Sequence, residues 1–413
     1  MSPTVRTAAA LALIAVAAVF VSWWVCALLV LVLAGALVAD AIVARRSVGV
    51  TRSLQPILAR GVPVPLTLTA DPTAGHVRLR QASPPDLVLA EKEGNGEVKT
   101  TVTARRRGRH ALPAPAARIV GPLGLAAWYR RPGDEVEVLV YPDLPAARRL
   151  ATAVRRGRFR AEGQARGPLG LGTDFESVRD YEPDDDVRQV NWRTTERLGR
   201  PMSNQYRLET DRDVICLVDC GRLMAAPLRD RTRLDAAIDA AVAVAAVADT
   251  VSDRCGAIAF DAQVSRRVAP RRSGGRAVVQ ALFDLEPVGV DSDYARAFAT
   301  VGEAKRAWVL LLTDILEETA ARPLLDALPS LARRHAVAVA SAVDADLNDL
   351  LVQPPQDRSD VYRAVVALDV RRAREGVTAA LRRRGVDVIE APAEQLAAAC
   401  VRAYLRSKAR ARV

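Results

Sequence analysis

The densest group of side chains able to do chemistry lies between residues 179 and 193, which read RDYEPDDDVRQVNWR. Pro183 followed by three aspartates predicts a turn, because Asp tolerates left-handed backbone geometry and its carboxylate binds nearby backbone N–H groups. Arg179 and Arg188 flank the acids, so we expect bidentate ion pairs that make the turn rigid. Trp192 supplies one large apolar anchor that we expect to be buried. We interpret the group as a built site; the alternative is a charged surface turn beside a core Trp.

Two kinds of catalysis are conceivable for these residue types. The adjacent acids Asp184, Asp185 and Asp186 could do general acid–base work, although ion pairing with the nearby arginines explains them better. Cys220 could be a nucleophile only if His335, one of three histidines, reached it from the start of another strand. A Walker loop, a G-x-G-x-x-G run and His/Cys metal spacing do not occur in the sequence, which argues against nucleotide hydrolysis. A hydrolase-like enzyme that uses the acidic loop stays an alternative to a protein that is not an enzyme.

Strands and helices alternate from Asp211 to the end of the chain, and this pattern decides where such side chains would meet. The expected strands are 214–219, 254–260, 307–314, 336–343 and 386–389, and the expected helices are 234–251, 275–285, 294–302, 323–334, 360–384 and 393–406. Short buried strands separated by helices predict an α/β domain with a doubly wound parallel sheet over residues 211–413. Two of these strands end in an acid, Asp219 and Asp314. Because ligands bind at the carboxyl ends of the strands in such sheets, the two acids mark the expected site.

An apolar run precedes everything else. Almost every residue from 7 to 43 is apolar, and a run of about 37 residues is too long for one membrane span of about 20 but suits two short ones. Trp23-Trp24 at its middle would lie at a membrane–water interface. Because Arg6 and Arg45-Arg46 flank the run, the positive-inside rule predicts that both ends and the soluble domains are cytoplasmic. We expect a two-helix transmembrane hairpin over residues 1–46 of a multi-pass plasma-membrane protein; a signal peptide is the alternative.

Residues 47–146 are expected to form a small β-sandwich that acts as a spacer or docking module. Strand signals recur at 62–69, 77–79, 87–89, 98–104, 109–111, 118–120 and 135–141. Pro63 and Pro65 would place the first of these strands at a sheet edge, because proline cannot donate to a ladder. Residues 147–210 are expected to hold a linker and the signature loop. The basic stretch 148–160 predicts either a short helix against lipid head groups or a solvated linker.

Composition favours a membrane-tethered intracellular protein. The five cysteines form no paired framework over 413 residues, which suggests reduced thiols. The net charge of +11 fits an anionic membrane surface or an acidic partner. A membrane-associated nucleic-acid binder is a weaker alternative, because the basic stretches 105–107, 155–166 and 382–384 lie far apart without interleaved aromatic residues.

The segment that starts at residue 179 resembles the signature of the bacterial family called domain of unknown function 58, R-x-Y-x-x-G-D-D-x-R-x-I-x-W-x-x-x-A-R. The residues that fall in step are Arg179, Tyr181, Asp185, Asp186, Arg188, Trp192 and Arg197, and with Asn191 they form the expected interaction site. Asp184 and Glu196 depart, since they stand where the family has Gly and Ala. The run from Gly121 to Leu125 is similar to the family's D-P-F-G-L, with Gly121 and Leu123 as departures.

The α/β domain also resembles a von Willebrand factor A domain, in which D-x-S-x-S after the first strand and a later Asp hold Mg²⁺ with the help of hydroxyls. Gly221 and Leu223 stand in place of the two Ser, which removes two ligands from a cation that prefers hard oxygen donors. We therefore expect Asp219 and Asp314 to serve structure or partner recognition, with a degenerate metal site as the alternative, and we expect no cofactor.

The family resemblance implies a function as well as a fold. Members commonly occur beside AAA+ ATPases of the MoxR type, so the resemblance implies a membrane-anchored adaptor or scaffold for such a partner in a chaperone-like envelope system. On this interpretation the protein is not an enzyme, contacts membrane lipid and binds no nucleic acid.

Overall fold

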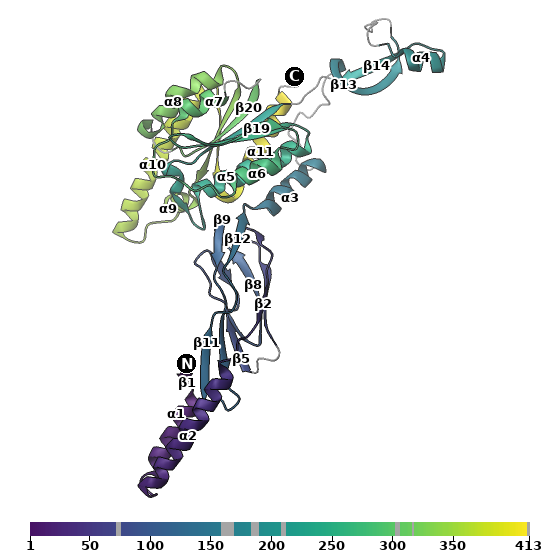
Figure 1. Cartoon of the computed structure of the whole chain (residues 1–413). Helices are drawn as coiled ribbons and strands as arrows, with labels where there is room; N and C mark the ends of the chain where they lie inside the picture. The colour runs from purple at the N-terminus through teal and green to yellow at the C-terminus, as the bar shows by residue number, and fades with distance from the viewer. Residues whose placement is uncertain are drawn as a thin grey trace. The chain divides into compact units, whose positions relative to one another are not determined.

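The computed structural model describes residues 1–71, 76–157, 169–182, 190–207, 212–301, 306–315 and 318–410. The chain divides into two compact units, Met1–Tyr141 and Pro142–Val413. The protein is mixed α/β, with two helices and many strands in the first unit and alternating strands and helices in the second (Figure 1). This agrees with the α/β class expected from the sequence.

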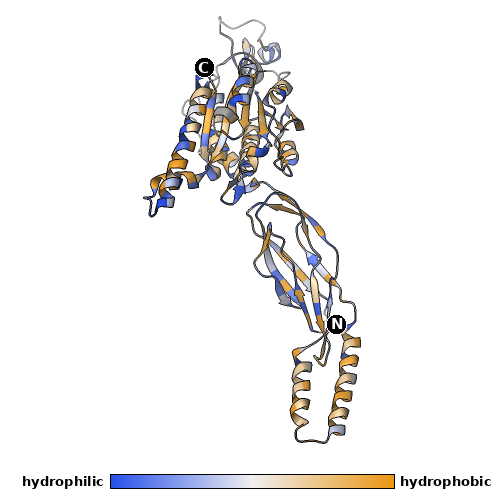
Figure 2. Ribbon diagram, turned by 90° about the vertical axis from the view of Figure 1, so that its left-hand side faces the viewer, coloured by the Kyte–Doolittle hydropathy of each residue, from blue (hydrophilic) through white to orange (hydrophobic). Residues whose placement is uncertain are grey.

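The first unit begins with two apolar helices, α1 (Val5–Ala17) and α2 (Trp23–Ala44), which lie side by side (Figure 2). Helix α2 has 22 residues and is long and apolar enough to cross a membrane. Helix α1 has 13 residues, fewer than the roughly 20 that a span needs. Among the described residues one helix therefore meets the length and composition of a span, where the sequence predicted two.

The rest of the first unit is built from three sheets, and all seven strands predicted there are present. The sheets are β1 (Ser2–Pro3), β11 (Ala126–Arg130), β10 (Ala116–Val120), β5 (His76–Arg80) and β7 (Glu93–Asn95); β3 (Ile57–Ala59), β12 (Val136–Tyr141) and β9 (Gly108–Leu112); and β2 (Val50–Ser53), β4 (Val64–Ala70), β8 (Glu97–Ala104) and β6 (Leu87–Leu89). Every second residue of β8 is buried, which is the two-residue period of a strand with one face on a core. The buried side chains of all three sheets form one apolar cluster that includes Leu66, Leu79 and Val138.

The prediction that the Pro65 strand lies at a sheet edge is wrong for the strand as a whole. Strand β4 lies between β2 and β8. The reason for the prediction, that proline cannot donate to a ladder, still holds at Pro65 itself. Strand β2 pairs only with Thr67–Ala70, so Pro65 has a partner, Thr101, on the β8 side alone.

Helix α2 is fastened to the strands of its own unit by Asp40, which is 1% exposed. Its carboxylate accepts 2.8 Å hydrogen bonds from the backbone N–H groups of Leu123, Leu125 and Ala126. Gly121 makes room for it, because a Cβ there would lie 2.2 Å from Oδ1 of Asp40. The departure from the family's D-P-F-G-L run thus coincides with a carboxylate that reaches the same turn from the helix.

The second unit contains a six-stranded sheet. Its order is β19 (Val264–Arg271), β18 (Arg254–Phe260), β15 (Asp213–Asp219), β20 (Ala307–Leu312), β21 (Ala336–Val343) and β22 (Asp387–Pro392). All neighbours are parallel except β18 and β19. The chain starts at a central strand, builds one side and then returns to build the other, which is the doubly wound pattern predicted from the sequence.

Helices cover both faces of this sheet. Helices α3 (Leu144–Arg155), α5 (Arg233–Thr250), α6 (Gly275–Leu282) and α11 (Ala393–Arg410) pack on one face, and α7 (Tyr294–Val301), α8 (Glu318–Ala332) and α10 (Arg358–Arg383) pack on the other. A further helix, α9 (Ala345–Val352), contacts α10. Helix α3 falls in the stretch for which a linker or a lipid-facing helix was expected. Instead, Ala147, Leu150 and Val154 place its apolar side in the core beside α5.

Candidate functional site

Asp219 ends β15, and all four acceptor positions of its carboxylate are used. Oδ1 accepts hydrogen bonds from the backbone N–H of Gly221 at 2.8 Å and from the hydroxyl of Ser292 at 2.5 Å. Oδ2 accepts hydrogen bonds from the hydroxyls of Thr313 at 2.6 Å and Tyr294 at 3.0 Å. Asp219 is 2% exposed, so these donors replace the water that its charge would otherwise need.

The missing side chain of Gly221 leaves the space that Ser292 fills. A Cβ at position 221 would lie 2.2 Å from the Ser292 hydroxyl oxygen, so a side chain there would force this hydroxyl out of its position. The hydroxyl that the sequence lacks at 221 is therefore supplied by the segment before α7. A cavity of about 300 Å³ opens beside this contact, and at its rim Arg222 pairs with Asp291 at 2.5 Å. The positive charge of Arg222 is thus neutralised at the surface.

Tyr294 is the first residue of α7, and its hydroxyl is one of the four donors to Asp219. Its ring packs edge-on against Phe260, with 5.6 Å between the ring centroids. Burial, reinforced by the charge of Asp219, raises the pKa of Tyr294 well above its ordinary value. The phenol therefore stays protonated near neutral pH and remains a hydrogen-bond donor to Asp219.

Asp314 follows β20 and binds arginines. Its Oδ1 accepts hydrogen bonds from Arg233 at 2.6 Å, Arg374 at 3.2 Å and the Ser341 hydroxyl at 3.2 Å. Thr232 caps α5 with its side chain and so fixes Arg233 at the first helical position. Burial lowers the pKa of Arg233 and the charge of Asp314 opposes that shift, so the guanidinium keeps its charge.

These two environments do not fit a magnesium ion. A cation at Asp219 would have to displace hydrogen bonds from all four donors, and a cation at Asp314 would face two guanidinium groups. In the part of the chain that the structure describes, His, Cys, Asp and Glu side chains form no group of three or more placed to hold a metal. What the arrangement does chemically is to fix the carboxyl ends of β15 and β20 through buried charge.

The described part of the signature segment is a two-stranded ladder beside a short helix (Figure 1). Strand β13 (Leu169–Asp180) pairs with β14 (Met202–Arg207), and α4 (Trp192–Leu198) lies between them in the sequence. Asn191 caps α4, because its Oδ1 accepts the Thr194 N–H at 2.9 Å while its Nδ2 donates to Asn204 at 2.8 Å. The amide predicted to bind a partner is thus used to form the helix.

The prediction that Trp192 is a buried anchor is wrong, because its side chain is 68% exposed. Two strands and a helix of seven residues form no core deep enough for an indole. Three exposed arginines share the segment with it: Arg193, Arg197 and Arg200. Arg200 forms an exposed ion pair with Asp180 at 3.2 Å.

The other predicted residues of the signature are placed only in part. The Arg179 guanidinium donates to the backbone carbonyl of Asp180 at 2.9 Å and lies 3.7 Å from the Glu182 carboxylate. Tyr181 joins the segment through its backbone N–H, which donates to the carbonyl of Pro201 at 3.0 Å. The turn residues Asp184, Asp185, Asp186 and Arg188 lie outside the described residues, so their ion pairs stay a prediction.

Cys220 and His335 do not meet. Cys220 follows the carboxyl end of β15 and is 1% exposed. His335 precedes β21, and its Nδ1 accepts the N–H of Ala307 at the start of β20. Because β15, β20 and β21 are parallel, the two side chains lie at opposite ends of strands, about 20 Å apart.

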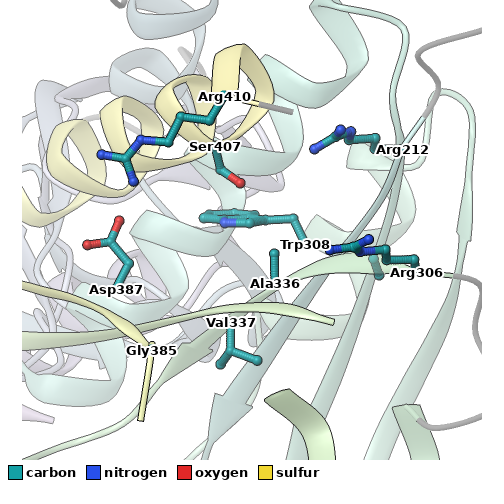
Figure 3. A pocket seen from close by; sticks show the side chains of 10 residues that line it. Arg212, Arg306, Trp308, Ala336, Val337, Gly385, Asp387, Ser407 and Arg410 are labelled. Atoms are coloured by element: carbon teal, nitrogen blue, oxygen red, sulfur yellow. The ribbon is translucent and has the colours of Figure 1, made fainter. Parts of the chain in front are cut away.

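A larger cavity, of about 580 Å³, lies at this opposite edge of the sheet (Figure 3). Figure 3 shows Arg212 and Arg306 on one side of Trp308 and Asp387 and Arg410 on the other. It is separate from the strand-end acids, so it does not enlarge their site.

The fold places the chain among mixed α/β proteins with an apolar N-terminal helix. In this chain the strand-end acids accept hydrogen bonds from the chain's own hydroxyl and guanidinium groups. Residues 177–385, just over half of the chain, match the family described as Protein of unknown function DUF58, and the chain belongs to this family. Relatives include uncharacterized proteins of Mycobacterium bovis and of Mycobacterium tuberculosis strain H37Rv. Each is 26% identical over 240 residues, which cover 51% of this chain and 74% of the relative.

Sequence reasoning found the two acids and missed their partners. Arg233 had a readable signal, since a basic residue in the first turn of a helix opposes the helix dipole and needs a nearby acid. Ser292 and Tyr294 lie more than 70 positions from Asp219, and a single sequence contains no sign of such a contact.

Proposed function

We propose that this protein is a membrane-anchored adaptor that presents a von Willebrand factor A-like domain and the signature segment to a protein partner, a MoxR-type AAA+ ATPase in a chaperone-like envelope system. The family resemblance suggests the partner, and the chemistry of the segment suggests how it is bound.

The exposure of Trp192 is the observation that carries the proposal. Leaving 68% of an indole in water is unfavourable, and Trp and Arg are the residues most enriched at the energetic centres of protein interfaces. Asn191 and Thr195 fix the helix that carries it, since Thr195 accepts the N–H of Met202 at 2.9 Å. Little conformational entropy would then be lost when a partner covers the indole.

The sheet supports the von Willebrand factor A-like part of the proposal. Its order, with one antiparallel edge strand, brings Asp219 and Asp314 to the same edge of neighbouring parallel strands. The hydrogen bonds of Asp219 favour a binding domain over an enzyme that uses this strand end, because both of its carboxylate oxygens are engaged.

Helix α2 supports the anchor. Its exposed Trp23 and Leu31 are 82% and 70% accessible and fit a lipid environment better than water. We further propose that α1 inserts beside α2 as a short hairpin, with both helix ends and the soluble parts on the cytoplasmic side, since Arg6 and Arg45-Arg46 flank the pair.

Capture from solubilised membranes tests the adaptor function. Full-length protein with Trp192→Ala would be compared with the parent and with Tyr362→Ala, an exposed aromatic residue of α10 that is 74% accessible. We expect the parent and Tyr362→Ala to retain an AAA+ ATPase and Trp192→Ala to lose at least about 30-fold in affinity, as for an interface hot spot.

Three results would contradict the proposal. Equal retention by all three proteins would remove Trp192 from the interface. Capture of no ATPase by the parent after mild cross-linking would remove the proposed partner, and turnover of a hydrolase substrate lost with Asp185→Ala would replace the adaptor with the enzymatic alternative.

A further inference from the structure

The surface of α2 changes from apolar to charged near the end of the helix. Exposed apolar side chains continue along the helix as far as Ile42 and Val43, and two exposed arginines, Arg45 and Arg46, follow at once. Helix rise is about 1.5 Å per residue, so this change occupies less than 10 Å along the axis. A lipid head-group layer has a similar thickness.

Hydrogen bonds bring part of the β domain to the same level. Asp40 binds the backbone of the turn at 121–126, as described above. The indole N–H of Trp128 then donates to the carbonyl of Ala41 at 2.8 Å, and Arg130 donates to the carbonyl of Arg45 at 2.8 Å. Strand β11 therefore runs beside the last turns of α2, and its turn lies where the apolar surface of the helix ends.

Helix α1 reaches the same turn. The hydroxyl of Thr7 donates to the carbonyl of Leu125 at 2.5 Å, and the hydroxyl of Thr4 donates to the carbonyl of Gly124. Hydrogen bonds thus hold both helices to the same turn. If the helices insert into a membrane, they therefore fix how deep this turn lies relative to the head groups.

The exposed side chains at this level are those of a membrane interface. Leu123 at the tip of the turn is 54% exposed, and Tyr129 on β11 is 62% exposed. Arg118 lies over the Tyr129 ring at 5.9 Å, and Arg130 lies over the Trp128 ring at 5.9 Å. Aromatic residues with arginines are typical of the head-group region, where the rings lie among the glycerol groups and the cations meet phosphate.

We propose that this collar, formed by Arg6, Arg45, Arg46, Leu123, Tyr129 and Arg130, is a docking surface for the head groups of anionic phospholipids. The inference depends on the proposed insertion of α2 and adds that the β domain itself touches the membrane. Leu123 enters the boundary of the acyl chains, and the arginines contact lipid phosphate. Asp40 does not oppose them, because its charge is turned inward onto three backbone N–H groups.

Fluorescence quenching in proteoliposomes tests the position of the collar. An environment-sensitive dye would be attached to full-length protein carrying Cys26→Ser and Leu123→Cys, since the other four cysteines are buried. Ile57→Cys is the matched control, because it is 53% exposed and lies on the sheet of β9 and β12, which Figure 1 draws away from the helices. The vesicles contain equal amounts of phosphatidylcholine and phosphatidylglycerol with a nitroxide quencher near the head groups.

We expect strong quenching at position 123 and none at position 57. Dye attached to the native Cys26 of α2 shows whether the helix is inserted, and so distinguishes a failure of the collar from a failure of the membrane anchor. Quenching at Cys26 without quenching at 123 would leave the anchor intact and overturn the collar. Absence of quenching at both positions would overturn the anchor and the collar together.

The role of the collar's charge is tested by neutralising an arginine pair of the collar and, as a control, an arginine pair outside it. Nitroxide-labelled phosphatidylglycerol should quench position 123 more effectively than the phosphatidylcholine analogue. Arg45→Gln with Arg46→Gln should reduce that preference by about fivefold per arginine, whereas Arg105→Gln with Arg106→Gln, an exposed pair next to β9, should not change it. Equal quenching by both lipids in the parent would overturn the assignment to anionic head groups.

Discussion

The hydroxyl of Thr313 donates a 2.6 Å hydrogen bond to Oδ2 of Asp219, so the residue that follows one strand holds the acid that ends its neighbour. Thr313 is 2% exposed and Asp219 is 2% exposed, and water cannot replace a lost donor easily at such a depth. The strand ends are thereby joined by a charge-assisted contact in addition to the backbone ladder.

Thr313→Val should therefore lower the stability of the second unit by about 1–3 kcal/mol, the cost of leaving a buried acceptor one donor short. Thr300→Val is the control, since its hydroxyl bonds the carbonyl of Arg296 on the exposed side of α7 and should change stability by less than about 0.5 kcal/mol. Thermal melts of the full-length protein in detergent measure both. Identical melts would show that the hydroxyl contributes nothing to holding Asp219.

Arg374→Ala should be among the most destabilising substitutions in the protein. It removes a guanidinium that is 5% exposed and leaves Asp314 with an uncompensated share of buried charge, at a cost of about 3–5 kcal/mol. Arg371 on the same helix forms an exposed pair with Glu375 at 3.5 Å, and Arg371→Ala should cost less than about 0.5 kcal/mol. Equal melting temperatures for the two variants would contradict the buried network.

Trp192→Ala should leave the melting temperature of the parent almost unchanged, within about 0.5 kcal/mol, because the indole is exposed. Trp308→Ala removes a Trp that is 4% exposed and packs on Tyr404, and it should cost about 3–5 kcal/mol. If Trp192→Ala melted as early as Trp308→Ala, the segment would bury its Trp against another part of the protein.

His335 should make stability depend on pH. Burial, with a smaller effect of Arg334, lowers the pKa of His335 below its ordinary value of 6.5, so the folded state binds fewer protons than the unfolded state. Its stabilising contribution is complete above pH 6.5 and decreases as the pH falls from 6.5 towards the folded pKa, by up to about 1.4 kcal/mol per pH unit. The difference in stability between the parent and His335→Gln should therefore decrease between pH 8 and pH 5. Below pH 6.5 its slope should reach at most about 1.4 kcal/mol per pH unit, the value for uptake of one proton on unfolding. A constant difference across this range would show that His335 does not titrate on unfolding.

Magnesium should not raise the melting temperature of the protein. Specific binding stabilises by RT ln(1 + [L]/Kd), so even a millimolar site would be visible at saturating metal. The donors around Asp219 are occupied, and Asp314 lies beside two arginines. A rise specific to Mg²⁺ and absent in Asp219→Asn would contradict the geometry described above.

The sequence was sufficient for the α/β pattern because each parallel strand is a short apolar run with both faces buried. Strand β15 is buried at all seven positions and was predicted within one residue. Strand β19 was missed because it lies at an edge, is largely exposed, and carries Arg266 and Arg267 where an apolar alternation would be expected. Helix α3 was missed as part of the core for a similar reason, since its arginines concealed an apolar side.

The site was predictable only where chemistry is local. Asp219 and Asp314 were found because strand ends can be read from a run of residues. The exposure of Trp192 could not be, because an aromatic residue beside charges looks the same whether a core or a partner covers it. The capping role of Asn191 had a local signal, an Asn directly before a helix. The charged residues around it favoured an interpretation as a partner-binding residue instead.

The contact between Gly221 and Ser292 also makes the side chain at one position depend on the side chain at the other. A serine at 221 would place its Cβ 2.2 Å from the Ser292 hydroxyl oxygen and 3.0 Å from the carbonyl oxygen of Val290, so it fits only if the Ser292 side chain turns away. That rotation would take the Ser292 hydroxyl away from Asp219 and leave the carboxylate with one donor fewer. We therefore expect substitutions at the two positions to be non-additive in their effect on stability.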